Sequence, residues 1–138
     1  AEGGAKAIEL AWKETGMDTD KVYFNAHGTG TAMNDRCETL AIKKALGEDR
    51  ARKILISSTK SMTGHMLGAA GAAEAVVSVL ALEEGIAPPT IGYKEADPEC
   101  DLNYVPNTAQ KAEFDVALSS SLGFGGHNAC LAFRKVEA

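Results

Sequence analysis

The chain has 138 residues, of which 45% are hydrophobic and 24% are charged, and its formal net charge at pH 7 is −5. This length fits one domain or part of one, with enough apolar residues for a core. The acidic balance, without any basic run, excludes nucleic acid and an electrostatic grip on membranes, and no apolar run is long enough to cross a bilayer.

Hydrophobic periodicity and turn signals predict helices and strands that alternate along the chain. At the start of the second helix, Asp35 and Glu38 have the spacing of a capping box. The last two strands are joined by a short Gly-rich loop over 123–126, which indicates an antiparallel hairpin. In chain order we expect a helix over about 4–14, a strand over 22–26, a helix over about 35–46, a strand over 54–58, a helix over about 65–84, and strands over 116–120 and 129–133.

The third predicted helix has small residues on every side over 68–73, so we expect it to pack closely and to be almost fully buried. Pro88 and Pro89 then force an extended connector. The polar segment 92–111 is irregular, with a short strand near 102–105. Together these elements predict an α/β domain in which helices cover a mixed sheet.

The three cysteines, Cys37, Cys100 and Cys130, are odd in number and widely spaced. This fits neither a disulfide framework nor a CxxC metal motif, so we expect reduced thiols and a cytoplasmic protein. The chain starts without Met and runs at once into a helical pattern, which suggests a piece cut from a longer protein.

Two histidines stand near the ends of predicted strands, where active sites of open α/β sheets are built. His27 lies in the segment NAHGTGT at 25–31, and His65 lies in STKSMTGHMLG at 58–68. Taken alone, His27 could be a satisfied polar residue at a sheet edge, and His65 could merely cap a helix. The helix dipole would also favour a neutral His65 ring, able to donate one N–H to an oxyanion.

Lys60 lies in an uncharged segment five residues before His65. It could be an ordinary surface lysine, or it could be held inward by an acid. Glu74 is the natural partner because it is the only charge in the middle of its predicted helix, and buried charges normally need one.

The sequence gives weaker support to two other kinds of site, a zinc site and a phosphate-binding loop. A zinc site assembled from the histidines His27, His65 and His127 with Cys37 lacks any recognised ligand spacing. The Gly-rich loop around Phe124 lies between two strands, so it is a weak candidate for a phosphate cradle. It fits a plain turn or a swinging gate equally well.

Taken as a set, three segments resemble the C-terminal part of the β-ketoacyl-acyl-carrier-protein synthases, of the synthase I/II type. They are NAHGTGT at 25–31, STKSMTGH at 58–65 and GFGGHN at 123–128. The resemblance implies a thiolase-like fold, with two similar α/β halves stacked in five layers. It makes residues 1–138 the C-terminal ketosynthase half, lacking its first strand.

The resemblance also implies functional residues. Family members use a Cys nucleophile, two His and a Lys, with other residues for a polar network, the phosphopantetheine arm, a gate and, in some members, a structural monovalent cation. Carried onto this sequence, it gives the catalytic residues His27, His65 and Lys60, the network acid Glu74, the phosphopantetheine contacts Thr29 and Thr31, the gate and oxyanion-hole residue Phe124, and the cation ligands Asn25, Glu74 and Ser119.

For the complete enzyme, the resemblance implies decarboxylative condensation of an acyl group with malonyl-acyl-carrier protein in fatty-acid biosynthesis. It implies a homodimer and no required cofactor, because the phosphopantetheine arrives on the carrier protein. The N-terminal half would supply the nucleophile, which none of the three cysteines here matches, so we expect no condensation by this chain alone.

One smaller departure concerns residues 120–122, which read Ser-Ser-Leu where the family usually reads Asn-Ser-Phe. An alternative also stays open. The chain could come from a paralogue that lacks the nucleophile and acts as a pantetheine-binding or chain-length-setting module.

Overall fold

The strand β1 (Val22–Asn25) lies inside a four-stranded sheet ordered β2-β1-β5-β6. It pairs in parallel with β2 (Leu55–Ser57) on one side and with β5 (Val116–Leu122) on the other. β5 pairs antiparallel with β6 (Asn128–Arg134). The computed structural model describes residues 2–92, 95, 97–123 and 126–136. It confirms the mixed sheet and the predicted hairpin.

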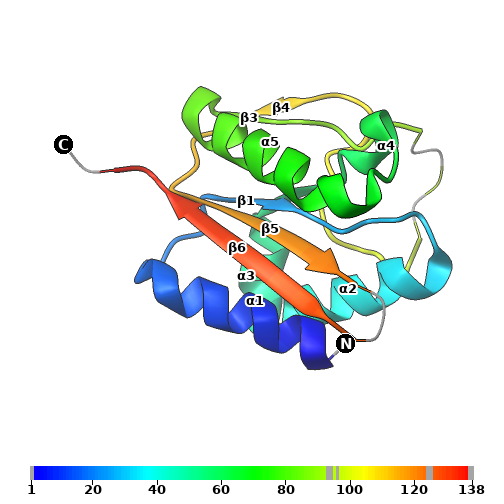
Figure 1. Ribbon diagram of the computed structural model, residues 1–138. Helices are drawn as coiled ribbons and strands as arrows, with labels where there is room; N and C mark the ends of the chain where they lie inside the picture. Colours follow the sequence, from blue (N-terminus) through cyan, green and yellow to red (C-terminus); the bar gives the residue numbers. More distant parts are fainter. Residues whose placement is uncertain (1, 93–94, 96, 124–125, 137–138) are drawn as a thin grey trace.

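Helices cover both faces of this sheet (Figure 1). One face carries α1, α2 and α3, and the other carries α5, with the short α4 near its start. None of the helices among the described residues is long and apolar enough to cross a membrane. The helices are α1 (Glu2–Thr15), α2 (Ala32–Leu46), α3 (Glu48–Lys53), α4 (Lys60–Thr63), the 3-10 turn η1 (Leu67–Ala69) and α5 (Ala70–Glu84), and a small second sheet pairs β3 (Ile86–Ala87) with β4 (Gln110–Lys111).

Side-chain alternation along β1 divides the interior into two cores. Phe24 packs in one cluster with Ile8 of α1 and Ile42 of α2, whereas Tyr23 packs in the other with Leu82 of α5. Successive side chains of a strand point to opposite faces. Asn25 therefore shares the α5 face of the sheet with Tyr23.

The predicted capping box at the start of α2 is wrong. The helix begins after Thr31, and no side chain caps its first turn. Glu38 is 5% exposed, and its carboxylate turns toward the loop after β1. That loop presents buried backbone N–H groups, which need an acceptor more than a partly exposed helix start does.

The third predicted helix is shorter and more exposed than expected. α5 begins at Ala70, so His65 lies before both η1 and the helix. One face packs against the sheet, but Val76, Val79 and Leu80 are 60%, 41% and 49% exposed. The small residues indicated close packing correctly, yet composition alone could not show that only one face is covered.

Short elements account for the other differences. The predicted strand near 102–105 runs beside β2, where the Ile56 N–H donates to the Asn103 carbonyl at 2.9 Å, but it forms no strand. α3, α4, β3 and β4 were not predicted, because elements of two to six residues are too short to show a period.

Replacing Ile42 tests the core beneath the sheet. Ile42 is 0% exposed, so Ile42→Ala should lower the free energy of unfolding of the complete protein by about 2–5 kcal/mol in urea denaturation. Leu40→Ala on the same helix, at a side chain that is 56% exposed, is the matched control. Equal losses in the two variants would show that the face of α2 has been misassigned.

Candidate active site

The carboxyl ends of the three parallel strands meet at one edge of the sheet. Asn25 is in register with Ser57 on one side and with Ser119 on the other. The Ala26 N–H donates to the Ser57 carbonyl at 2.9 Å, so pairing continues one residue past β1. The chain segments that carry the two predicted catalytic histidines therefore leave the sheet side by side.

A buried glutamate holds the loop after β1. The N–H groups of His27 and Gly28 donate to the two carboxylate oxygens of Glu38, at 2.6 and 2.9 Å. Burial raises the pKa of Glu38, although these two hydrogen bonds oppose the shift. From the sequence, Glu38 is predicted to lie in a capping box. Its spacing from the buried Ala41 and Ile42 places it on the core face of α2, and that signal could have identified it.

The structure brings the two predicted histidines together. The centroids of the His27 and His65 rings are 5.6 Å apart, and the rings are nearly perpendicular, at 87°. His65 is exposed, and its Nδ1 accepts the Leu67 N–H at 3.1 Å. An accepting nitrogen carries no proton, so the ring N–H of His65 is on Nε2. His65 therefore caps the backbone through one nitrogen and keeps a donor at the other.

His27 lies in a drier setting, with 8% of its surface exposed. Burial lowers its pKa to about 4, and the charge of Lys60 and the neighbouring His65 add to the effect. Its Nδ1 is buried and has no hydrogen-bond partner among the described residues. The ring is therefore neutral at pH 7 and can donate one N–H.

Lys60 and Glu74 form the predicted ion pair. Lys60 Nζ lies 2.6 Å from Glu74 Oε2, and the two side chains are 5% and 4% exposed. This confirms the inward orientation of Lys60, although the residue begins α4 rather than lying in a loop. The pair joins α4 to α5, close enough to His27 for the charge of Lys60 to lower the pKa of that histidine.

Two buried oxygens near this pair lack donors. Glu74 Oε1 and Asn25 Oδ1 have no hydrogen-bond partner among the described residues. The Asn25 amide donates to the Tyr23 hydroxyl at 3.1 Å and to the Thr59 hydroxyl at 3.3 Å, which fixes its orientation. Buried acceptors of this kind normally face a donor or an ion.

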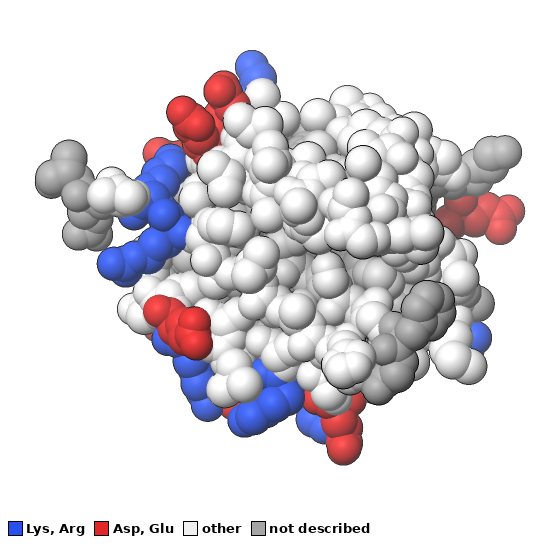
Figure 2. All heavy atoms as spheres, in the orientation of Figure 1, with Lys and Arg blue, Asp and Glu red and all other residues white. Residues whose placement is uncertain are grey.

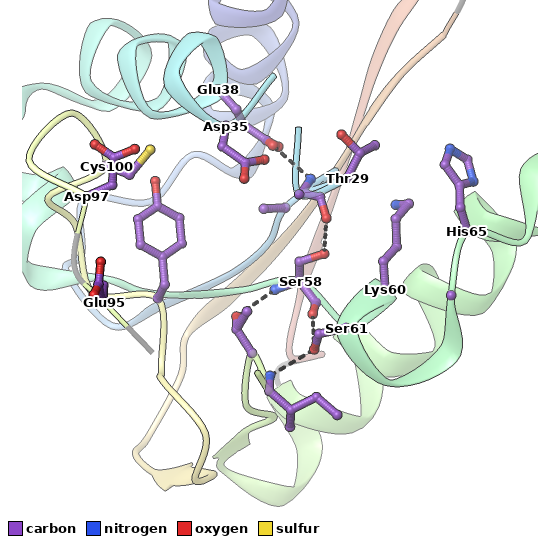
Figure 3. A pocket seen from close by; sticks show the side chains of 17 residues that line it. Thr29, Asp35, Glu38, Ser58, Lys60, Ser61, His65, Glu95, Asp97 and Cys100 are labelled. Carbon is purple, nitrogen blue, oxygen red and sulfur yellow. Dashed lines mark hydrogen bonds between the residues drawn. The ribbon is translucent and has the colours of Figure 1, made fainter. Parts of the chain in front are cut away.

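The site opens into a pocket of about 650 Å³. Figure 3 shows Lys60 and His65 on one side of it and Glu95, Asp97 and Cys100 on the other. Thr29 also lines the pocket.

The structure says less about the remaining predicted site residues, Thr29, Thr31 and Phe124. The hydroxyls of Thr29 and Thr31 are 3.0 Å apart. The predicted gate, Phe124, lies outside the described residues. Among the described residues, no group of three or more His, Cys, Asp or Glu side chains is placed to hold a metal ion, which includes the set with His127 and Cys37.

The family is decided by comparison with known proteins. The family model described as "Beta-ketoacyl synthase, C-terminal domain" matches residues 1–94. The chain belongs to the β-ketoacyl synthase family. The resemblance read from the three sequence segments is thereby confirmed.

Curated relatives agree over nearly the whole chain. The 3-oxoacyl-[acyl-carrier-protein] synthase 2 of Synechocystis sp. is 54% identical over 136 residues, which cover 98% of this chain and 32% of the relative. The protein of the same name from Staphylococcus aureus strain COL is 50% identical, covering 99% and 33%. The chain thus spans about a third of the length of these relatives.

Solved structures confirm the thiolase-like ketosynthase fold. A β-ketoacyl synthase from Burkholderia phymatum superimposes with a TM-score of 0.89 at 37% identity, covering 99% of this chain and 33% of that one. The ishigamide ketosynthase/chain length factor gives 0.91 at 38% identity, covering 99% and 33%. A type II polyketide ketosynthase in complex with its acyl-carrier protein gives 0.90 at 42%, covering 98% and 34%.

The environment of His27 predicts its titration. Its imidazole ¹⁵N shifts should show a neutral ring at pH 7 and protonation near pH 4. Because the unfolded chain takes up this proton near 6.5, stability falls as the pH drops from 6.5 toward about 4. Lys60→Met should raise the pKa of His27, because it removes a positive charge close to that ring. A wild-type midpoint near 6.5 would show that the ring is well hydrated.

A double-mutant cycle tests the buried ion pair of Lys60 and Glu74. Lys60→Met strands the buried Glu74 carboxylate and should lower the free energy of unfolding by about 3–5 kcal/mol. The double variant Lys60→Met/Glu74→Leu should recover most of that loss, since no buried charge remains. Both are measured by urea denaturation of the complete protein. A double variant no more stable than the single one would mean that the pair is not the source of the loss.

Proposed function

We propose that the complete protein containing this chain is a 3-oxoacyl-[acyl-carrier-protein] synthase of fatty-acid biosynthesis. It condenses an acyl group with a malonyl group carried on acyl carrier protein and releases carbon dioxide. The observation that carries the proposal is the pair of rings, His27 and His65, 5.6 Å apart beside the pocket. The curated relatives, at 54% and 50% identity, bear the same activity in their names.

In this proposal the two histidines stabilise an enolate. The bond from the malonyl methylene carbon to its carboxylate breaks, and the electron pair moves to the thioester oxygen as carbon dioxide leaves. A neutral His27 and the Nε2–H of His65 donate to that oxygen. Donors placed at a developing oxyanion are worth about 2.7–4 kcal/mol each.

The new carbon–carbon bond then forms between the enolate carbon and an acyl thioester on a cysteine outside this chain. The cysteine thiolate leaves, and the β-ketoacyl product stays on its carrier. Electrons are neither gained nor lost overall, so the reaction needs no redox cofactor. Lys60 supports the step by disfavouring protonation of His27, which keeps that ring a neutral donor.

The carrier arm enters through the pocket in this proposal. Thr29 and Thr31 would contact the phosphopantetheine with their hydroxyls, and Phe124 would act as the gate. One structural neighbour is described as an acyl-carrier protein in complex with its ketosynthase. We extend that partner class to this chain because Thr29 and His65 line the same pocket.

Buried oxygen atoms that lack donors in the described part of the chain support a structural monovalent cation as part of this proposal. Asn25 Oδ1 and Glu74 Oε1 are buried acceptors without a donor among the described residues, and Ser119 is in register with Asn25. Oxygen atoms of this kind are the ligands that hard cations take. We propose that Asn25, Glu74 and Ser119 would hold the ion, whose charge would balance the unpaired acceptors.

The rest of the ketosynthase would cover the apolar face of α5. Figure 2 shows a broad area without Lys, Arg, Asp or Glu on the side where Figure 1 places α5 and β6. Val76, Val79 and Leu80 are exposed on α5. We propose that the N-terminal half packs there and that the complete protein forms a homodimer.

Assays of the separate half-reactions test this function. In the complete protein, His27→Ala and His65→Ala should each reduce decarboxylation of malonyl-carrier by about 10²–10³-fold. Acyl transfer to the cysteine should persist. Thr29→Val should instead raise KM for the carrier, because it removes a hydroxyl from the pocket.

Two results would contradict this function. Decarboxylation that survives loss of both histidines would refute their role. A wild-type protein that binds carrier without decarboxylating it would instead favour the alternative of a paralogue without the nucleophile.

A further inference from the structure

The two histidine-bearing segments are in direct contact at Gly28 and Ser58. The Ser58 hydroxyl donates to the Gly28 carbonyl at 2.8 Å (Figure 3). A Cβ atom at Gly28 would lie 2.4 Å from Ser58 Cβ, a distance at which something must shift. Gly28 also has a positive φ of 40°, which favours glycine. The contact is therefore tight and leaves no space for a side chain at position 28.

Ser58 is itself held firmly on the side of the Lys60 helix. Its N–H donates to the Thr90 hydroxyl at 3.1 Å, and its carbonyl accepts the Ser61 hydroxyl at 2.9 Å. The carbonyl also accepts the Ser61 N–H at 3.2 Å, so Ser58 is part of the first turn that leads into α4. Since α4 ends at Thr63, one short helical turn links Ser58 to the segment that carries His65.

Gly28 is held from the opposite side by α2. Its N–H donates to Glu38 at 2.9 Å, while its carbonyl accepts from Ser58. The peptide groups next to His27 are thus fixed between a carboxylate on one element and a hydroxyl on another. Of these two contacts, only the one with Ser58 connects His27 to the segment that carries His65.

We propose that Ser58 is a positioning residue that sets the separation of His27 and His65 through the Gly28 carbonyl, and thereby the rate of malonyl decarboxylation. This inference rests on the proposed function. Ser58 also lines the pocket, but its only O–H is donated to the Gly28 carbonyl, so the hydroxyl acts through the loop of His27 rather than on the substrate. Removing it should let the loop move without removing either imidazole.

The decisive variant is Ser58→Ala in the complete protein, because it deletes one oxygen and keeps the Cβ packed against Gly28. The matched control is Thr15→Val. Thr15 is 7% exposed and its hydroxyl donates to the Trp12 carbonyl at 2.7 Å, on α1, away from the pocket. Three quantities are measured in both variants: the ¹⁵N shifts of the two catalytic imidazoles, kcat and KM for malonyl-carrier decarboxylation, and the rate of acyl transfer to the enzyme.

We expect Ser58→Ala to lower kcat for decarboxylation by about tenfold, the effect of one lost hydrogen bond. KM and acyl transfer should stay within about twofold of wild type, because the lost hydrogen bond affects only the positions of the two histidines. The imidazole shifts of His27 and His65 should change together. Gly28→Ala, which forces the segments apart, should lower decarboxylation by about a hundredfold. Thr15→Val should change none of these quantities.

Two outcomes would overturn the proposal. One is a Ser58→Ala protein with wild-type decarboxylation and unchanged imidazole shifts. The other is an equal loss of decarboxylation and acyl transfer, which would mean a general structural defect. If wild-type protein shows no decarboxylation while Ser58→Ala still shifts both imidazoles, the proposed function fails but the positioning by Ser58 stands.

Discussion

Parallel pairing of β1 with both β2 and β5 is the constraint on which the site depends. It places the carboxyl ends of three strands at one edge, with Asn25, Ser57 and Ser119 in register. Chain segments that are far apart in the sequence then leave the sheet at neighbouring points. Antiparallel pairing of β1 with β2 would have sent the two histidine loops to opposite ends of the molecule.

The interior around this edge of the sheet is polar. The sheet face under α5 changes from apolar packing at Tyr23 and Leu82 to a set of buried polar groups at Asn25, Lys60 and Glu74. Buried polar groups are stable only when their partners are in place. Among these groups, Lys60 acts on His27, whose pKa is lowered first by burial and then by the charge of Lys60.

The sequence predicted which side chains meet at this site better than it predicted what holds them in place. His27, His65 and the Lys60–Glu74 pair follow from motif order and from one charge in an otherwise small-residue helix. Glu38 was assigned to a cap, because an acid three residues after Asp35 also matches a local pattern. The contact between Gly28 and Ser58 joins segments 30 residues apart, and only the folded chain reveals it.

The exposure of one face of α5 could not be predicted from the sequence, for a related reason. A run of apolar and small residues is the same whether a helix is covered on one face or on all of them. The hairpin of β5 and β6 and the helices α1 and α2 could be predicted because their turn signal and hydrophobic periods lie within the sequence. The cover of α5 depends on which neighbours pack against it.

The buried Lys60–Glu74 pair also restricts how this sequence can evolve. Codons change singly, and either replacement alone leaves an unpaired charge in the interior. A lineage that replaces one residue of the pair must pass through a less stable variant until the second residue is also replaced. Descendants should therefore retain both residues or have lost both, so the two positions should change together among related sequences.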